Sequence, residues 1–125
     1  MTRKEFFNKY DEFVSLAMAC SEKARREGFL ALEEELDLDK INERDIFYLG
    51  LSLAIDRVDK EIIEKILSNI VKQERDEYML LLKDIQKEAV FSIHEGFNPR
   101  LLATLLLSYL TKEEADEIVR RILRD

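Results

Sequence analysis

Apolar residues recur at intervals of three and four along most of the chain, which is the spacing of one face of an α-helix. The first such stripe consists of Phe13, Leu16, Ala17, Cys20, Ala24, Phe29, Leu32 and Leu36. It predicts a helix that starts near residue 11, or a few residues earlier, and runs to about residue 36. Gly28 lies inside this stripe, where glycine costs about 1 kcal/mol relative to alanine. A glycine there indicates either close approach by another helix or a local break.

The middle of the chain predicts a short helix and a long one. Asn42 is a natural N-cap for the short helix, whose apolar positions are Ile46, Phe47, Leu49, Leu53 and Ala54. Asp59 can cap the next helix, whose stripe is Ile62, Ile63, Ile66, Leu67 and Ile70. A polar run at 72–77 interrupts the stripe, which resumes with Tyr78, Leu81, Leu82, Ile85 and Ala89. We expect one long helix over about 59–93, ending before Gly96 as its C-cap.

The last third has the sharpest boundaries. Asn98 is an N-cap, and Pro99 occupies the first helical position, where its missing N–H costs nothing. The helix over about 99–110 is apolar nearly all round, so we expect it to be central. Thr111 and Glu114 have the spacing of a capping box, and in the helix that follows the positions expected to face inward are Ala115, Ile118, Val119 and Ile122. The prediction is an all-α fold: a single compact bundle of about five helices that forms one domain over residues 1–125.

Charge and composition narrow the possible partners and the location. The net charge of −7 argues against nucleic acid or anionic lipid as the main partner. No apolar run approaches the roughly 20 residues of a membrane-spanning helix, so membrane insertion is not expected. The charged, aromatic opening does not resemble a secretory signal, and the single cysteine, Cys20, fits a reducing compartment. We therefore expect a cytoplasmic protein.

Candidate catalytic and metal-binding groups are scarce. His94, the only histidine, lies at a predicted helix end, where capping of carbonyls is the commoner role. Cys20 lies on the apolar stripe, where an inert buried thiol is expected rather than a nucleophile. A calcium-binding EF-hand loop starting at Asp37 would need an oxygen ligand and a glycine where the chain has Ile41 and Asn42. The sequence therefore predicts no enzyme, no cofactor and no metal site.

The most informative polar segment surrounds Gly28. Lys23, Arg25 and Arg26 precede the glycine, and Glu33, Glu34 and Glu35 follow it. One interpretation is a solvated helix face with i,i+4 ion pairs, each contributing about 0.2–0.5 kcal/mol. The other is a charged docking surface, on which complementary charge sets the association rate and the specificity. In the second interpretation the protein-interface residues are Arg25, Arg26, Glu33 and Glu34.

The same segment carries a resemblance. The string ARREGFLALE at residues 24–33 resembles an "ARREGLLALE"-like stretch in the cytoplasmic region of MotA, the flagellar stator subunit. A looser likeness continues through Phe47, Gly50, Leu53, Asp56 and residues 59–63, so that it covers about residues 14–78. In that family the region meets the rotor through charged side chains. The resemblance implies such a role for Arg25, three residues before the glycine, and for Glu33, five after it.

The chain differs from the stator family in one respect, and it also resembles a second motor protein. The membrane helices that carry the stator's ion path are missing on both sides, so this chain is not expected to work as a stator. A second likeness covers about residues 98–122. The motif at residues 98–115 resembles an "HPQ…A.ILSYL.PE.AA"-like pattern in a helix pair of the rotor protein FliG. Both likenesses imply a flagellar motor context, with rotor or stator proteins as partners.

Two functional hypotheses follow. The first is a non-enzymatic, MotA-like accessory or scaffold domain that binds flagellar motor components through the charged face of the first helix. The alternative is a structural protein with no motor role, which forms a homo-oligomer through its long helix. The seam of that oligomer would be Ile63, Ile66, Ile70, Leu81 and Ile85.

Overall fold

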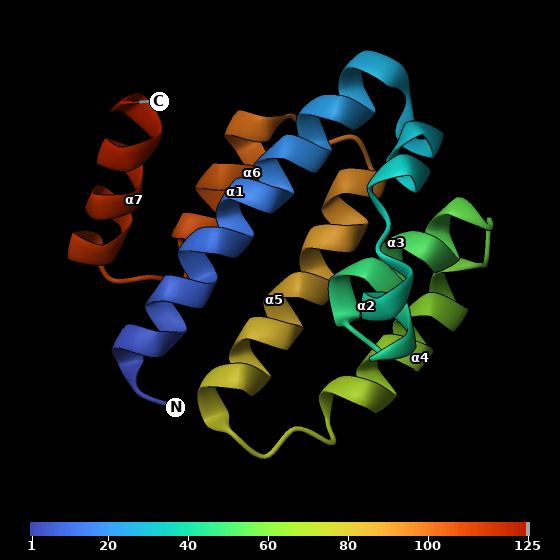
Figure 1. Ribbon diagram of the computed structural model, residues 1–125, viewed down its shortest axis with the longest axis horizontal. Coiled ribbons are helices and arrows are strands. Elements are labelled where there is room, and N and C mark those ends of the chain that lie inside the picture. The colour runs from blue at the N-terminus through green and yellow to red at the C-terminus, as the bar shows by residue number, and fades with distance from the viewer. Residues whose placement is uncertain (125) are drawn as a thin grey trace.

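A computed structural model describes the backbone of residues 1–124 and the side chains of residues 1–122. Every regular element in this part of the chain is helical, which confirms the predicted all-α bundle (Figure 1). The elements are more numerous than the five expected: α1 (Arg3–Glu27), the 3₁₀ helix η1 (Phe29–Glu35), α2 (Leu38–Asn42), α3 (Ile46–Ile55), α4 (Lys60–Val71), α5 (Glu77–His94), α6 (Pro99–Leu107) and α7 (Lys112–Arg124).

Helix α1 begins earlier and ends earlier than the apolar stripe indicated. Thr2 and Glu5 form a capping box: the Thr2 hydroxyl accepts from the Glu5 amide at 3.1 Å, and the Glu5 carboxylate accepts from the Thr2 amide at 3.3 Å. The stripe therefore extends back through Phe6 and Tyr10, which are both fully buried. At the other end Gly28 adopts φ +94° and stops the helix. The predicted continuation to residue 36 is wrong, and the local break is the correct interpretation of the glycine.

The predicted long helix over 59–93 is also wrong, because residues 72–76 form a turn between α4 and α5 (Figure 1). Asp76 caps α5 by accepting hydrogen bonds from the amides of Tyr78, at 2.9 Å, and Met79, at 3.0 Å. The polar run is thus a loop that lets both halves of the stripe face one core. Three residues of the proposed oligomer seam, Ile63, Ile70 and Ile85, are buried within the chain itself.

Helix α5 lies in the middle of the fold and packs against α1, α3, α4 and α6. The larger core cluster lies mainly between α1, α5 and α6, and a smaller cluster lies between α3 and α4. Gly50 lets α3 approach α5 closely, since a Cβ at this position would lie 2.7 Å from Cγ2 of Val90. The predicted glycine C-cap of α5 is confirmed in the form of a Schellman motif, with Gly96 at φ +95° and the Phe97 amide donating to the Ser92 carbonyl at 3.0 Å.

The two C-terminal helices differ in how deeply they are buried. Leu102, Ala103 and Leu106 of α6 are buried, whereas Leu101 is 47% exposed. The expectation of a central helix thus holds for only one side of α6. Helix α7 lies beside α1 (Figure 1) and buries Ile118 completely. None of the described helices combines the length and the apolarity that crossing a bilayer requires.

Candidate functional site

The four predicted interface residues lie at the junction of α1 and η1. Gly28 ends α1, and its amide donates to the Ala24 carbonyl at 2.9 Å. The chain then reverses, so that η1 packs back against α1. Lys23 joins the two elements, because its Nζ lies 2.9 Å from Oε2 of Glu34 and 2.8 Å from Oε1 of Glu35. The hydrogen bonds to Glu35 and Glu34 raise the pKa of Lys23, which stays charged at neutral pH.

We call the surface formed by Arg25, Arg26, Glu33 and Glu34 the α1–η1 corner; all four side chains are exposed. The sequence pattern placed the basic and the acidic residues on one helix, and this prediction is wrong. They come from two elements that the turn at Gly28 folds together.

The members of the corner differ in their pairing. Arg26 lies 3.5 Å from Glu22 one turn earlier in α1, and Glu34 is paired with Lys23. Arg25 and Glu33 have no ion-pair partner within the described part of the chain. The corner thus presents one guanidinium and one carboxylate whose charges no neighbouring side chain neutralises.

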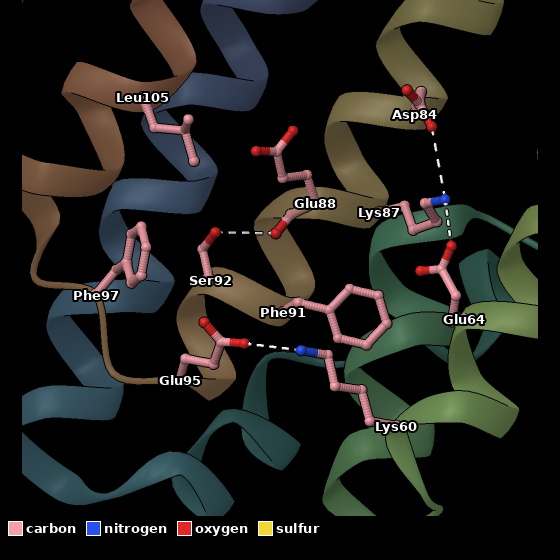
Figure 2. A pocket seen from close by; sticks show the side chains of 10 residues that line it. All are labelled: Lys60, Glu64, Asp84, Lys87, Glu88, Phe91, Ser92, Glu95, Phe97 and Leu105. Carbon is pink, nitrogen blue, oxygen red and sulfur yellow. Dashed lines mark hydrogen bonds and ion pairs between the residues drawn. The ribbon is translucent and has the colours of Figure 1, made fainter.

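A second candidate site lies along the exposed side of α5, between α4 and α6 (Figure 2). We call it the α5 groove; its volume is about 530 Å³. Its main lining side chains are Lys60 and Glu64 of α4, Glu88 and Phe91 of α5, Glu95 just after α5, and Leu105 of α6. Figure 2 labels the remaining ones. Aromatic and aliphatic groups therefore lie beside charged groups in one open depression.

Ion pairs cross the α4 side of the groove. Lys60 lies 3.0 Å from Glu95 and also lies over the Phe91 ring, 5.5 Å from its centroid. Lys87 lies 2.8 Å from Glu64, whose pKa it lowers by hydrogen bonding. These pairs hold α4 against α5 and neutralise two of the carboxylates that line the groove.

The carboxylate of Glu88 has a different environment. Tyr109, just beyond the end of α6, donates its hydroxyl hydrogen to Glu88 at 2.5 Å, and this bond raises the pKa of Tyr109 to about 12. Glu88 has no cationic partner among the described residues. A half-buried carboxylate with only a neutral donor leaves hydrogen-bonding capacity for a cation that enters the groove.

The sequence did not reveal this groove, although one signal for it was present. Leu101, Leu105 and Tyr109 are spaced four residues apart, so they form a second apolar stripe beside the buried one. From the sequence, this all-round apolarity predicted a central helix. Leu101 is 47% and Tyr109 41% exposed, and Leu105 lines the groove.

Two side chains, Cys20 and His94, are the candidates for chemistry. Cys20 is buried, and burial raises the pKa of its thiol to about 11. His94 is the last residue of α5, and its ring lies 4.7 Å from that of Phe29, measured between centroids. In the described residues, no three His, Cys, Asp or Glu side chains are grouped so that they could hold a metal ion.

Comparison of the chain with protein-family models, with curated proteins and with solved structures finds no match.

Proposed function

We propose that this protein is a non-enzymatic docking domain whose α1–η1 corner binds another protein through paired charges. The observation that carries the proposal is the pairing pattern at the corner. Arg25 and Glu33 are exposed and have no internal ion-pair partner within the described residues, while their neighbours Lys23, Arg26 and Glu34 are paired. Unpaired charges of both signs on a rigid surface can select a partner whose charges have the opposite signs at the facing positions.

The local structure supports this role. Capping by Gly28 and the two bonds of Lys23 fix η1 against α1, so little ordering of the backbone is needed when a partner binds. The charges at the corner would increase the rate of association and make it sensitive to salt. The alternative based on a continuous self-association seam has no such support, because that seam is divided between α4 and α5 and is largely buried.

The partner class in this proposal comes from the resemblance of residues 24–33 to the stator cytoplasmic region. On this basis the partner is a flagellar rotor or stator protein, and the chain acts as an accessory or scaffold in the cytoplasm. Arg25 would pair with an acidic side chain and Glu33 with a basic one. This arrangement fits the exposure of both residues at the corner.

Binding to purified FliG and to the purified cytoplasmic region of MotA from the source organism tests the proposal. The native chain is expected to bind one of them more weakly as salt is raised. The Arg25→Glu/Glu33→Lys variant is expected to bind at least about tenfold more weakly, corresponding to roughly 1.4 kcal/mol. The matched control is Arg120→Glu/Glu117→Lys on α7, which makes the same charge changes at two other exposed residues.

The possible outcomes separate the site from the partner. Equal affinity of the native chain and the Arg25→Glu/Glu33→Lys variant would exclude the corner as the binding surface. Failure of the native chain to bind either protein at low salt would exclude these motor proteins as partners.

A further inference from the structure

The α5 groove combines features that suit a particular kind of ligand. Its α6 side is apolar: Leu105 lines it, and Leu101 lies one helical turn earlier with 47% of its surface exposed. Phe91 contributes an aromatic ring on the α5 side. An amphipathic helix binds grooves of this kind by inserting apolar side chains spaced three and four residues apart.

The charge of the groove indicates the sign of the ligand. Four carboxylates line it, those of Glu64, Asp84, Glu88 and Glu95, against two ammonium groups, those of Lys60 and Lys87, which leaves a net charge of −2. Glu64 and Glu95 are paired with the two lysines at 2.8 and 3.0 Å. The excess negative charge therefore lies on Asp84 and on Glu88. Asp84 is 3.7 Å from Lys87, which is a longer distance than in the other two pairs.

Glu88 is the group through which a cation would be recognised. Figure 2 shows its carboxylate rising from α5 between Leu105 on one side and Asp84 on the other. Its one hydrogen-bond partner among the described side chains is the neutral hydroxyl of Tyr109. A guanidinium group suits such a carboxylate, because it donates two parallel hydrogen bonds and its flat face packs well against aromatic rings.

From these observations we propose that the α5 groove binds a basic amphipathic helix of a partner protein. The apolar face of that helix packs on Leu101, Leu105 and Phe91, and an arginine beside this face pairs with Glu88. The groove shares no residue with the α1–η1 corner, so this second docking site goes beyond the function proposed for the corner. Nucleic acids and acidic peptides are disfavoured by the negative charge of the lining.

The test uses the full-length chain and designed helical peptides of about 18 residues, long enough to form five turns. The main probe has leucines along one face and arginines on both flanks of that face. One matched probe replaces the arginines with glutamates, and another replaces the leucines with serines. Affinity is measured by fluorescence anisotropy, and the binding surface is mapped by NMR on the isotope-labelled protein.

The arginine probe is expected to bind, with the largest NMR shifts at Phe91, Ser92 and Leu105, while both matched probes bind at least about tenfold more weakly. Glu88→Gln keeps an acceptor for Tyr109 but removes the charge, and it should weaken the arginine probe about tenfold. Leu101→Ser should weaken the same probe, because the proposal places the exposed side chain of Leu101 against the apolar face of the bound helix. The corner variant Arg25→Glu/Glu33→Lys should bind it as the native chain does.

Several results would overturn the proposal. These are NMR shifts centred outside the groove, equal affinity of native and Glu88→Gln proteins for the arginine probe, and equal affinity for the arginine and the serine probes. The last result would mean that the groove recognises cations alone. Retained probe binding by the corner variant, together with its loss of binding to motor proteins, would show that the two surfaces act independently.

Discussion

Arg3 and Glu114 join the two ends of the described chain through a bidentate ion pair. Nε of Arg3 lies 2.9 Å from Oε2 of Glu114, and Nη2 lies 2.6 Å from Oε1. Glu114 also completes the capping box of α7, since its Oε1 accepts from the Thr111 amide at 3.0 Å and its amide donates to the Thr111 hydroxyl at 3.2 Å. One carboxylate thus starts α7 and attaches it to the first turn of α1.

The stabilisation that Glu114 provides is expected to depend on pH. The hydrogen bond from Arg3 lowers the pKa of Glu114 from 4.5 to about 2. A carboxyl whose pKa is lower in the folded state stabilises the fold above its unfolded pKa, and this contribution is lost as pH falls from about 4.5 through about 2. Glu114→Gln preserves a side chain able to cap but removes the charge, so it should cost about 1 kcal/mol at pH 7.

Urea unfolding at pH 7 and at pH 3 measures this effect. The difference in unfolding free energy between the native chain and Glu114→Gln should shrink at the lower pH. Glu113→Gln, a neighbouring exposed residue of the same helical turn, is the matched control and should show a smaller difference at pH 7. A cost for Glu114→Gln that does not vary with pH would show that the ion pair contributes nothing to stability.

The sequence predicted the starts of α6 and α7 correctly from their side-chain caps. The capping box of Thr111 and Glu114, and the Asn98 cap before Pro99, are present as predicted. Two other predicted caps are wrong: Asn42 is the last residue of α2 while Asp45 caps α3, and Asp59 precedes α4 but its side chain makes no capping hydrogen bond.

The periodicity of apolar residues identified the core positions but not the breaks between helices, because two helices joined by a short turn can continue one stripe. Asp76, which caps α5, was hidden in a run of charged residues.

The sequence did not predict the ends of α2 and α3, because arginine occupies the left-handed position after each helix, where glycine is expected. Arg44, at φ 61°, follows α2, and Arg57, at φ 63°, follows α3. Both α2 and α3 end in a Schellman motif, in which glycine is the usual residue. The candidate sites were harder still to predict, since the α5 groove exists only because α4 and α6 flank α5. No local pattern encodes that arrangement.

Replacing Arg57 with glycine is expected to stabilise the protein. The backbone at Arg57 is left-handed, and its amide donates to the Ala54 carbonyl at 3.0 Å. A side chain with a Cβ is strained in this conformation, so Arg57→Gly should raise the unfolding free energy by about 1 kcal/mol. Arg57→Ala, which removes the long side chain but keeps the Cβ, is the control and should give no such gain in thermal or urea unfolding. Equal stability of the two variants would indicate that the conformation is not strained.

Adding a methyl group at Gly50 is expected to destabilise the protein, although alanine favours helices. The new Cβ would lie 2.7 Å from Cγ2 of Val90 and 3.1 Å from Cδ1 of Leu67. We expect Gly50→Ala to cost about 1–3 kcal/mol through overpacking. In a double-mutant cycle, Val90→Ala should make the Gly50→Ala substitution less costly, because it removes the methyl groups that clash. Additive effects of the two substitutions would mean that α3 and α5 are not limited by this contact.

Labelling of Cys20 can report how often the core opens. The side chain is only 3% exposed, and burial raises the pKa of the thiol to about 11. The thiol is therefore protonated at pH 8, and little of the reactive thiolate forms in the folded state. An aromatic disulfide reagent should react with the folded chain far more slowly than with the chain unfolded in urea.

The Gly50→Ala variant distinguishes global opening from local opening at Cys20. If labelling requires unfolding of the whole core, the labelling rate should rise about tenfold for each 1.4 kcal/mol that the substitution removes from stability. Glu113→Gln, on the exposed side of α7, should leave the rate nearly unchanged. A rate that is already fast in the native chain, or that does not respond to Gly50→Ala, would indicate that α1 exposes Cys20 through a local opening. In that event the larger cluster, to which Cys20 belongs, would not open as one cooperative unit.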